Sequence, residues 1–595
     1  MIAILGKGVS PDEFLARKML AAAPHRGSCI ALRTLGNCAL GVANRPDSVD
    51  EAISSEGPLI AAFSGRLDNA TDLRDRLAMA GSPPASPADA DIVVAAFKLF
   101  GADAPNRMRG AFAGLVTDGT TLWCFRDHVG FRPLFYRDEA ATFVAASEAR
   151  QVVVGARLSE EPDFAVLEQM FFGRMPSNAP AALKGVARLP QATTLTVSRE
   201  KGTRTTRYWN PAALLESARY NSGELRDRFL ELMNQAASRS LTGNDVILLS
   251  GGLDSPAVAA FAAPESRRRN GRPLGALSAV FPELPSVDER HYIELVAERF
   301  SIELRTYHPR ARALDDVDEW CRRFGSPVPI LSIPEVADVY SLARQHGYGN
   351  VITGEFAEFV FGNPIHVVPH HLSRGHLGAL TKLLVAERRR GSSLRNLAGR
   401  VSETFVPGRL ANWYLRQRGL DAPDRIPDWL DARKVNEVPF RSDLLPPIRE
   451  RWRRLQLAGT EGATISIEAD EACAAMSGVT IRRPLADIDL WEFFLSLPAE
   501  LKCPDLRFKS LARGLLRGVV PDEILDRRRK TLFNDHVMTQ VDYPTLSRLL
   551  VGSQHSLPGV NYARLAQRIQ QRDFNRFDWF WAKDLAWIHA FLNAW

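Results

Sequence analysis

The stretch Asp245-Val-Ile-Leu-Leu-Ser-Gly-Gly-Leu-Asp-Ser-Pro-Ala-Val-Ala-Ala-Phe261 decides how the rest of the chain is interpreted. Val246 to Leu249 are apolar and predict a short buried strand. Ser250 to Ser255 then form a glycine-containing turn, and Pro256 suits the first turn of a helix because its missing N–H would be unpaired there. Strand, loop and helix N-terminus together predict an anion site, since backbone N–H groups and the helix dipole both attract negative charge. The loop has no lysine in the Walker position, so it is not a P-loop.

Ser250-Gly-Gly-Leu-Asp-Ser255 resembles the pyrophosphate loop of the ATP pyrophosphatases. Members of that superfamily split ATP between its α and β phosphates and adenylate a carboxylate or carbonyl oxygen. The resemblance implies that Asp254 helps to bind Mg²⁺ and that the rest of the loop holds pyrophosphate through Ser250, Gly251, Gly252 and Ser255. It also implies nucleotide-binding positions at the ends of the predicted strands, namely Leu249, Phe281, Thr353 and Gly354. The alternative is a glycine turn without a ligand.

Size and composition are those of a globular protein of two or three domains, with 595 residues, 45% hydrophobic and 24% charged. A net charge of +6 is small for this length, so we expect no nucleic-acid partner. The six cysteines form no C-x-x-C pair, which argues against a zinc ribbon or a disulfide framework. No apolar run has membrane-spanning length, and residues 1–7 are too short for a signal peptide. We therefore expect a cytoplasmic protein without a membrane partner; its oligomeric state is left open.

Residues 1–210 predict one antiparallel, β-rich domain, because short apolar runs alternate there with turn residues. Several phrases resemble the glutaminase domain of class B asparagine synthetases, which has an N-terminal-nucleophile fold. The phrases are Pro24-His-Arg-Gly27, Phe63-Ser-Gly-Arg66, Met108-Arg-Gly-Ala-Phe-Ala113, Phe125-Arg-Asp-His-Val-Gly-Phe-Arg-Pro-Leu-Phe-Tyr136, Ala145-Ala-Ser-Glu148, Lys184-Gly-Val-Ala-Arg-Leu-Pro190 and Arg207-Tyr-Trp-Asn210.

The departures from that family concern its catalytic positions. The family uses a cysteine directly after the initiator methionine, and this chain has Ile2 there. Ser64-Gly65 replaces an Asn-Gly oxyanion pair, and Arg66 replaces the glutamate that follows it. A hydrocarbon cannot act as a nucleophile, so we expect the glutaminase to be inactive. An upstream start codon that hides a working cysteine is the alternative.

Residues 221–595 predict a doubly wound α/β domain, because helices alternate with short strands. A helix is expected over Ser222 to Ser240, and Ser286 is expected to cap a second helix that runs to Phe300. The expected strands are 246–249, 274–281, 302–307 and 350–353. The whole chain is thus expected to be α/β, with an antiparallel N-terminal domain and a parallel C-terminal sheet. Within that second domain, residues 363–460 are predicted to form a basic helical insert.

The loop Gly354-Glu-Phe-Ala-Glu-Phe-Val-Phe-Gly362 is the second chemical site. It resembles the asparagine synthetase phrase Thr-Gly-Glu-Gly-Ala-Asp-Glu-Leu-Phe-Gly. That resemblance implies that Glu355 lies beside the attacking amine and that Glu358 is a metal ligand in place of aspartate. Phe356 and Phe359 replace a glycine and an acid, which predicts a more apolar active-site mouth. A solvated helix face is the alternative for the two glutamates.

The C-terminal part returns to the family pattern at Thr480-Ile-Arg-Arg-Pro-Leu-Ala-Asp487, Phe508-Lys-Ser-Leu511 and Val519-Val-Pro-Asp-Glu-Ile-Leu-Asp-Arg-Arg-Arg-Lys530. Lys530 matches the lysine that contacts the α-phosphate region in this superfamily, where an ammonium would stabilise developing charge. A solvated basic run is the alternative. In the insert, the basic runs at 387–390 and 449–454 would serve either as a lid for an acidic or peptidic partner or as solvated helix faces. The aromatic residues from Phe574 to Trp595 predict a helix docked on the core.

The chemistry that these resemblances imply is ATP-dependent amide formation through an acyl-adenylate, with ATP and Mg²⁺ as cofactors. Because the glutaminase is expected to be inactive, the combination resembles lasso peptide cyclases, and less closely β-lactam synthetases. Lasso cyclases join the N-terminal amine of a precursor peptide to an Asp or Glu side chain. The expected partners are then a precursor peptide and its leader-processing protease. The rival hypotheses are an ammonia-dependent asparagine synthetase and a non-catalytic scaffold.

Overall fold

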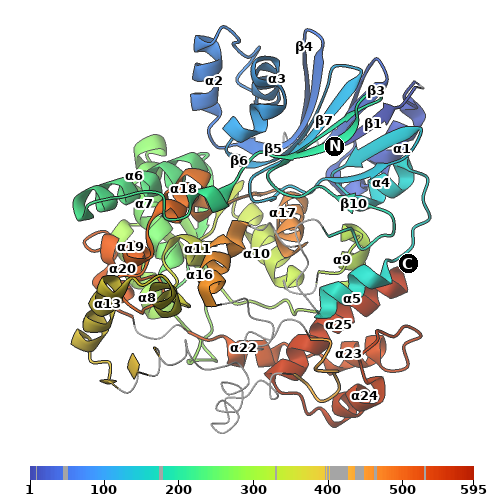
Figure 1. The fold of residues 1–595 in the computed structure, drawn as a ribbon. Helices are drawn as coiled ribbons and strands as arrows, with labels where there is room; N and C mark the ends of the chain where they lie inside the picture. Colours follow the sequence, from blue (N-terminus) through green and yellow to red (C-terminus); the bar gives the residue numbers. More distant parts are fainter. Residues whose placement is uncertain are drawn as a thin grey trace.

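A computed structural model describes most of the chain and shows two lobes, with the N-terminal strands above most of the C-terminal helices in the view of Figure 1. The described residues are 1–8, 10–44, 51–172, 179–328, 332–394, 397–398, 401, 426–435, 448–460, 465–527 and 531–595.

The upper lobe is built from two six-stranded sheets in which every strand pair is antiparallel. The first sheet has, in spatial order, β10 (Ala187–Arg188), β8 (Phe135–Asp138), β9 (Thr142–Ala146), β1 (Ile2–Gly6), β3 (Cys38–Asn44) and β2 (Cys29–Leu35). The second has β12 (Gly202–Arg207), β11 (Thr193–Ser198), β7 (Thr121–Arg126), β6 (Gly110–Thr117), β5 (Leu59–Leu67) and β4 (Glu51–Glu56).

Side-chain alternation along the strands produces four layers in this lobe. Ala3 and Leu5 of β1 face the second sheet, and the apolar residues between the sheets form one core. Ile2 and Ile4 point the other way, into a core shared with α1 (Glu13–Ala21) and α4 (Ala149–Gly155). The outer face of the second sheet is covered by α2 (Ala70–Met79) and α3 (Asp89–Phe100). The remaining helices of this part are η1 (Pro24–Arg26), η2 (Gly101–Arg107), α5 (Phe164–Phe172) and η3 (Pro211–Leu214).

The lower lobe contains a five-stranded sheet in which every pair of strands is parallel. Its order is β15 (Glu303–Tyr307), β14 (Gly275–Ala279), β13 (Asp245–Leu248), β16 (Asn350–Ile352) and β17 (Thr480–Arg482). The chain moves outward from β13 to β15 and then returns to the other side of β13 with β16. The carboxyl ends of β13 and β16 therefore flank the point where the strand order reverses, which is where ligands bind in such sheets.

Helices cover both faces of this sheet, again because neighbouring strand residues point in opposite directions. Val246 and Val351 share a core with α9 (Val317–Phe324), α10 (Ile333–Gln345), α17 (Ile465–Met476) and α25 (Arg576–Ala594). Ile247 and Ile352 share another with α6 (Ser222–Ser240), α7 (Asp254–Asn270), α8 (Arg290–Phe300) and α18 (Ile488–Ser496). The α/β class, with an antiparallel N-terminal part and a doubly wound parallel sheet, is confirmed.

The other elements of the lower lobe are mostly short helices. They are α11 (Ala357–Val360), α12 (Val367–Ser373), α13 (Leu377–Arg389), α16 (Ile448–Leu457), η5 (Ala458–Thr460), η6 (Pro484–Ala486), α19 (Ala499–Lys502), α20 (Ser510–Leu515), α21 (Asp522–Leu525), α22 (Asn534–Thr539), α23 (Tyr543–Leu550) and α24 (Tyr562–Gln571). Within the predicted insert, α12, α13 and α16 are helical, and many of its other residues lie outside the described part.

One predicted helix start is wrong. α8 begins at Arg290, not near Ser286, and Glu289 occupies the N-cap position. The Ser286 hydroxyl donates instead to the carboxylate of Asp535, a residue far away in the chain. The predicted strands and the helix over Ser222–Ser240 are observed with boundaries within two residues of the expectation.

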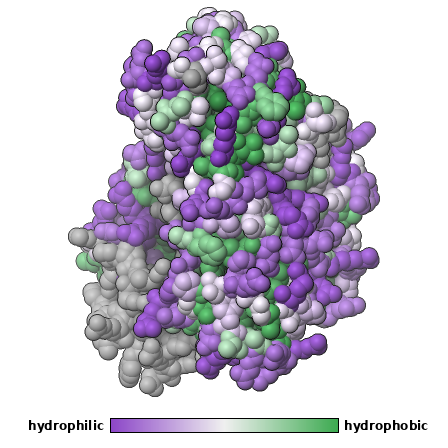
Figure 2. All heavy atoms as spheres, turned by 90° about the vertical axis from the view of Figure 1, so that its right-hand side faces the viewer, coloured by the Kyte–Doolittle hydropathy of each residue, from purple (hydrophilic) through white to green (hydrophobic). Residues whose placement is uncertain are grey.

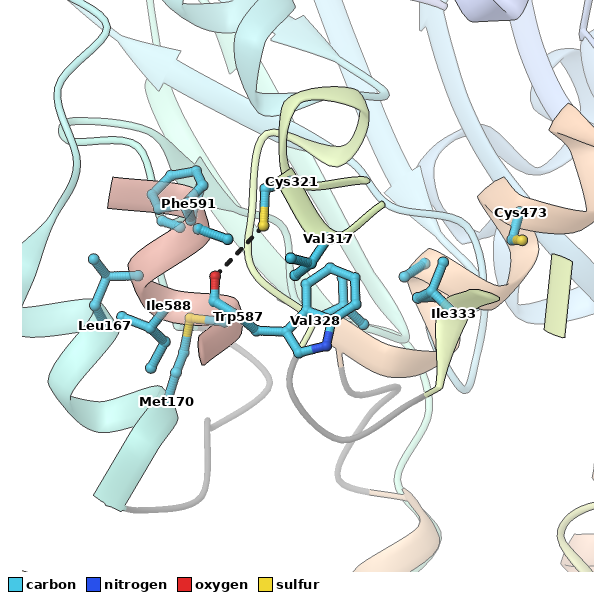
Figure 3. Close-up of a cluster of buried hydrophobic side chains, with 14 of the residues drawn as sticks. Leu167, Met170, Val317, Cys321, Val328, Ile333, Cys473, Trp587, Ile588 and Phe591 are labelled. Atoms are coloured by element: carbon cyan, nitrogen blue, oxygen red, sulfur yellow. Dashed lines mark hydrogen bonds between the residues drawn. The ribbon is translucent and has the colours of Figure 1, made fainter. Parts of the chain in front are cut away.

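The two lobes share an apolar core around α25, the predicted C-terminal aromatic helix. Trp587 and Ile588 of α25 lie between α5 of the N-terminal part and α9 of the C-terminal part (Figure 3). Cys321 on α9 donates its thiol to the carbonyl oxygen of Trp587 at 3.4 Å. Phe171 on α5 meets Trp581 edge-on, with ring centroids 5.3 Å apart. The last helix therefore joins the two parts of the chain.

The surface combines hydrophilic and apolar regions. On the face shown in Figure 2, apolar side chains gather in the upper lobe and lie scattered among hydrophilic ones lower down. Among the described residues, no helix has both the length and the apolar character needed to cross a bilayer.

Candidate active site

The predicted phosphate loop connects β13 to α7 and is closed by its own serines. The backbone N–H of Ser250 donates to the Ser255 hydroxyl at 2.9 Å, and the two hydroxyl oxygens are 3.1 Å apart. Gly252 donates its N–H to the Ser250 hydroxyl over 3.4 Å. Leu249, in contrast, is buried and donates its N–H to the carbonyl of Leu277 on the neighbouring strand. The loop is thus a compact turn at the N-terminus of α7.

Gly251 is fixed by two charged side chains from other elements. Its N–H donates to Glu289 Oε2 at 3.0 Å, and Arg527 Nη1 donates to its carbonyl oxygen at 2.7 Å. Arg527 also donates to Glu289 Oε1 at 2.7 Å, so the three groups form a closed unit. A Cβ atom on Gly251 would lie 2.7 Å from the Cβ of Glu289, closer than real Cβ contacts come. Glycine is therefore required here by the close approach of α8.

Lys509, a lysine without a predicted role, contacts the loop. Lys509 Nζ lies 2.5 Å from Asp254 Oδ2, and its ammonium contacts both carboxylate oxygens. The Lys509 backbone has φ = +63°, and its N–H donates to Gly362 O at 2.6 Å, which aims the side chain at α7. The phrase Phe508-Lys-Ser-Leu511 resembles the family pattern, but nothing in it indicates this contact. Lys530, the lysine predicted for the α-phosphate, lies outside the described residues.

The second predicted loop, after β16, packs directly on the first. A Cβ atom on Gly354 would lie 2.5 Å from the backbone nitrogen of Ser255, so only glycine allows this approach. Thr353 donates its N–H to the Arg482 carbonyl at 2.9 Å, and its hydroxyl donates to Glu355 Oε2 at 3.2 Å. The predicted phosphate loop and the predicted amine-side glutamate are therefore brought together at the strand-order reversal.

Glu355 is half exposed and is held by a buried arginine. Its side chain is 51% exposed, whereas that of Arg483 is 2% exposed, and Arg483 Nε donates to Glu355 Oε2 at 2.7 Å. The guanidinium also donates to Asp470 and Glu471 on α17. Burial disfavours the charged guanidinium, but the surrounding carboxylates outweigh burial and keep the pKa of Arg483 well above its usual value. Arg483 therefore stays cationic beside Glu355.

Phe356 and Phe359 do not form the expected apolar mouth. Phe356 is 8% exposed and packs against Phe131 of the N-terminal part, with ring centroids 5.6 Å apart. Phe356 and Phe359 also contact Trp491, each with a centroid separation of 5.8 Å. The physical reason is that these rings pack against other aromatic side chains, that of Phe356 across the interface between the two lobes. The backbone of Phe356 is left-handed there (φ = +73°), a conformation that is rare for an aromatic residue.

The residues near the loops suit ATP and Mg²⁺ in their chemistry. Glu358 on α11 is exposed, and Asp254 is partly exposed. Both side chains carry carboxylates, the kind of ligand that Mg²⁺ takes in proteins together with phosphate oxygens and water. Among the described residues, no group of three or more His, Cys, Asp or Glu side chains could hold a metal by itself. The ring centroid of Phe281, just after β14, lies 4.7 Å from that of His536 and 5.8 Å from that of Phe533. Aromatic rings of this kind can stack on a purine.

The place of a glutaminase nucleophile is filled by packed hydrocarbon. Ile2 is 0% exposed and pairs on β1 with Gly41 on one side and Ala146 on the other. Ser64 is also buried, and the neighbouring Arg66 donates to Asp68 at 3.2 Å. These positions carry no thiol, so the departures seen in the sequence correspond to a site without its nucleophile.

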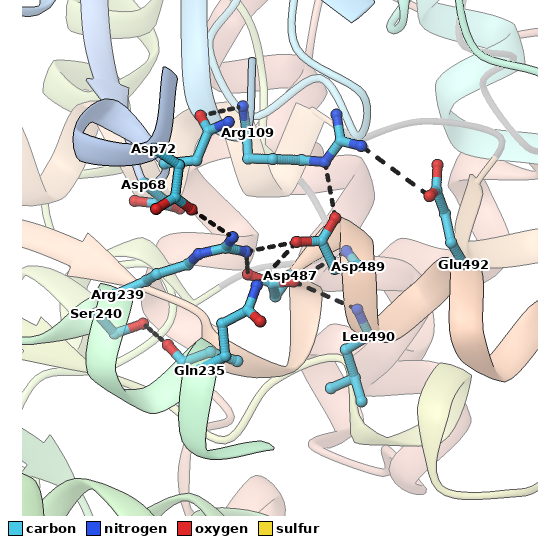
Figure 4. A network of polar contacts seen from close by, with 12 residues as sticks. Asp68, Asp72, Arg109, Gln235, Arg239, Ser240, Asp487, Asp489, Leu490 and Glu492 are labelled. Atoms are coloured by element: carbon cyan, nitrogen blue, oxygen red, sulfur yellow. Dashed lines mark hydrogen bonds and ion pairs between the residues drawn. The ribbon is translucent and has the colours of Figure 1, made fainter. Parts of the chain in front are cut away.

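A network of partly buried ion pairs crosses the boundary between the two lobes (Figure 4). Arg109 donates to Asp489 at 3.0 Å, and Arg239 contacts Asp487 and Asp489 at 2.9 and 2.7 Å. Beside it is a cavity of about 20 Å³, room for about one water molecule. Its charged lining is Arg66, Asp68, Arg109, Arg239, Arg483 and Asp487.

Comparisons with known proteins found matches for both parts of the chain. Residues 228–579 match the asparagine synthase family, and residues 1–209 match the glutamine amidotransferase domain. The chain is 25% identical to asparagine synthetase [glutamine-hydrolyzing] 3 of Bacillus subtilis over 80% of its own length and 75% of the relative's. It is 20% identical to asparagine synthetase [glutamine-hydrolyzing] 1 of the same organism, over 78% and 74% of the two lengths. A solved glutamine phosphoribosylpyrophosphate amidotransferase from B. subtilis aligns with 59% of this chain and 81% of its own, at 14% identity and a TM-score of 0.27.

Proposed function

The chain belongs to the asparagine synthase family, and from that premise we propose that it is an ATP-dependent, AMP-forming amide ligase. The observation that carries the proposal is the meeting of two loops: Gly354 packs on the nitrogen of Ser255, so Glu355 lies next to the phosphate loop. A phosphate site and a carboxylate base at one place are what adenylation followed by amine attack requires. A scaffold without activity would have no need of this arrangement.

In the first step, a substrate carboxylate attacks the α-phosphate of ATP, which forms an acyl-adenylate and releases pyrophosphate. The Ser250–Ser255 loop and the N-terminus of α7 bind the departing pyrophosphate. Lys509, now paired with Asp254, supplies a cation that can move onto the phosphate oxygens as charge develops there. Asp254 and Glu358 would hold Mg²⁺, which neutralises phosphate charge when it is bound.

In the second step, an amine attacks the activated carbonyl, AMP leaves, and the amine loses a proton. Glu355 is the proton acceptor in this proposal. Both hydrogen bonds that described residues make to it reach Oε2, so Oε1 is available to accept the proton. Arg483 keeps the carboxylate oriented toward the site.

For the substrate, we propose a peptide whose N-terminal amine is joined to one of its own Asp or Glu side chains, as in lasso peptide cyclases. The absence of a nucleophile at Ile2 supports an amine that comes from outside the chain. The helices α13 and α16 carry arginines that would suit a peptide with acidic side chains. The partners would then be a precursor peptide and the protease that removes its leader.

An ammonia-dependent asparagine synthetase is the second candidate, and two observations favour it. The relatives that align over most of their length are named asparagine synthetases. In addition, Phe356 packs in the interface between the lobes, so its size does not exclude a small substrate such as aspartate. A β-lactam synthetase-like reaction on a small molecule belongs to the same class.

The experiment supplies the protein with ATP and Mg²⁺ and two kinds of probe. One is L-aspartate with ammonium, and the other is a set of synthetic peptides with a free N-terminus and one Asp or Glu at successive positions. A peptide product that is lighter by one water, formed with AMP and pyrophosphate, supports the cyclase proposal. Asparagine formed from free aspartate contradicts it and supports the second candidate. ADP and phosphate as products would contradict the ligase proposal itself.

A substitution of the proposed base separates the two steps. Glu355→Gln keeps the size of the side chain and its bond from Arg483 but cannot take a proton. We expect ATP–pyrophosphate exchange to persist while amide formation falls by roughly a hundred- to ten-thousand-fold. Glu358→Gln is the matched control on the same loop, and it should impair exchange through the metal. Equal loss of both activities in Glu355→Gln would contradict the role of Glu355.

A further inference from the structure

We propose that the N-terminal domain has kept a role in amide formation as the positioning element of Glu355. Its residues Phe131 and Arg132 brace Arg483, and Arg483 holds the Glu355 carboxylate. The inference rests on the proposed role of Glu355 as the proton acceptor, and it assigns a task to a domain that lacks its glutaminase nucleophile.

The first link is between Glu355 and Arg483. A glutamate that is 51% exposed has many side-chain conformations, and ordering it requires a fixed partner. Arg483 is such a partner, because its side chain is 2% exposed and its Nε lies 2.7 Å from Glu355 Oε2. The contact holds Oε2 of the Glu355 carboxylate in place. With Oε2 held, Oε1 keeps a fixed position from which it can accept a proton from the amine.

The second link fixes Arg483 itself. Its three guanidinium nitrogens are directed at three different carboxylates: Nε at Glu355, Nη1 at Glu471 and Nη2 at Asp470. Asp470 in turn accepts a hydrogen bond from the Tyr340 hydroxyl at 2.7 Å. A planar fork of donors is needed to reach three acceptors in fixed directions, and the single ammonium of a lysine does not supply it.

The third link comes from the N-terminal domain. The Phe131 ring centroid lies 5.1 Å from the Arg483 guanidinium carbon, and the same ring lies 5.6 Å from that of Phe356, the residue next to Glu355. Arg132 Nε is 3.5 Å from Oε2 of Glu471, the same residue that accepts a hydrogen bond from Arg483. Phe131 is 6% exposed, so its ring is buried against Arg483 and Phe356 and has little room to move.

The loop that carries Phe131 and Arg132 is built rigidly around Asp127, which is 0% exposed. Asp127 Oδ1 accepts the backbone N–H groups of Val129, Gly130 and Phe131 at 3.1, 2.6 and 3.1 Å. Asp127 Oδ2 accepts the N–H of Arg132 at 3.1 Å. Because one buried carboxylate fixes four consecutive amides, the loop holds Phe131 and Arg132 in fixed positions, and these two residues in turn restrict the movement of Arg483.

The test compares three variants of the full chain. Phe131→Leu removes the ring beside Arg483, and Arg483→Lys keeps the charge but not the fork. Phe143→Leu is the matched control: Phe143 is also buried, in the core between the two sheets, and it faces Tyr136. Thermal unfolding of each variant shows whether it folds, and if Arg483→Lys does not, Phe131→Leu carries the test.

The first measurement is backbone hydrogen exchange over residues 353–360, made without any substrate. We expect exchange there to become roughly 2- to 30-fold faster in Phe131→Leu, the range that corresponds to losing a cation–π contact. Phe143→Leu should exchange like the natural protein over the same residues. Unchanged exchange in Phe131→Leu, or an equal change in the control, overturns the proposal.

The second measurement uses ATP, Mg²⁺, and the aspartate–ammonium and peptide probes. In Phe131→Leu and Arg483→Lys, we expect kcat for amide formation to fall at least tenfold more than pyrophosphate exchange. Hydroxylamine, whose nitrogen is largely unprotonated at neutral pH, should be acylated at nearly the natural rate, because it needs less help from a base. Equal loss of exchange, amide formation and hydroxylamine acylation would mean that Phe131 only supports the fold, and would overturn the proposal.

The two proposals fail in different ways. If the natural protein forms no AMP with any probe, the ligase proposal fails, and hydrogen exchange alone decides whether the N-terminal domain orders the Glu355 loop. If the natural protein forms the amide but Phe131→Leu behaves like Phe143→Leu, the ligase proposal stands and the positioning role is wrong.

Discussion

Glu468 joins the two lobes through ion pairs, and replacing it tests how strongly the N-terminal domain is held. It lies on α17, and its Oε1 is 2.5 Å from Arg126 Nη2, while its Oε2 contacts Arg188. Burial disfavours the ionised carboxylate, but the charges of Arg188 and Arg126 outweigh burial and lower the pKa of Glu468. We expect Glu468→Gln to remove the negative charge and leave both arginines buried without it.

The expected loss follows from the burial of the three groups. The side chains of Arg126, Arg188 and Glu468 are 1%, 6% and 8% exposed, so water cannot replace the lost partner. Arg126 still donates to the carbonyls of Arg132 and Leu189 at 2.7 and 2.9 Å, so it loses its counter-charge but not every hydrogen bond. Removing one partner of a buried pair costs about 3–5 kcal/mol. The equilibrium constant for unfolding should therefore rise by roughly a hundred- to four-thousand-fold.

The assay is urea denaturation of Glu468→Gln beside Asp526→Asn. Asp526 pairs with Arg517, but their side chains are 52% and 46% exposed, so that variant should lose less than about 1 kcal/mol. A loss for Glu468→Gln no larger than for this control would refute the reasoning.

The pH dependence of the same experiment has a definite sign. Because the folded pKa of Glu468 is lowered, its stabilisation is present above the unfolded pKa of about 4.3 and is lost as pH falls toward the folded pKa. The difference in stability between the natural protein and Glu468→Gln should therefore shrink on acidification below about pH 4.

Three further predictions concern the site. Lys509→Met should lower ATP–pyrophosphate exchange by roughly a hundred- to thousand-fold. Lys201→Met, on an exposed turn, is the control and should not lower it. Similar exchange rates for the two variants would exclude Lys509 from adenylation. Incubation with glutamine should give no glutamate above background. Ile2→Cys should not create glutaminase activity, because position 2 is 0% exposed within a strand. Robust glutamate release by the natural protein would contradict this prediction. Gly354→Ala should lower the melting temperature and pyrophosphate exchange, since its Cβ would lie 2.5 Å from Ser255 N; natural values of both would show that the two loops can separate without cost.

Local sequence was sufficient to predict an element wherever that element is formed by residues that follow one another in the chain. The β13 strand, its glycine loop and α7 follow one another in the chain, so an apolar run, two glycines and a proline predicted their order. The glycine at 354 was recognised from its motif, but the reason for it, contact with Ser255, is tertiary. The Phe356 interpretation was wrong because substitution alone does not show whether a ring faces a substrate or another domain.

The sequence by itself determined the fold class, the order of strand, glycine loop and helix over residues 245–261, and the hydrocarbon side chain at Ile2, because each depends on residue chemistry or on short-range periodicity. Only the tertiary structure decided which charges meet. Arg483 reaches Glu355 across 128 positions, and Lys509 reaches Asp254 across 255. Such pairs leave no periodic signal, because they depend on how the parallel strands and the two lobes bring distant segments together. The surroundings of Glu355 are thus a property of the packed interface between the lobes.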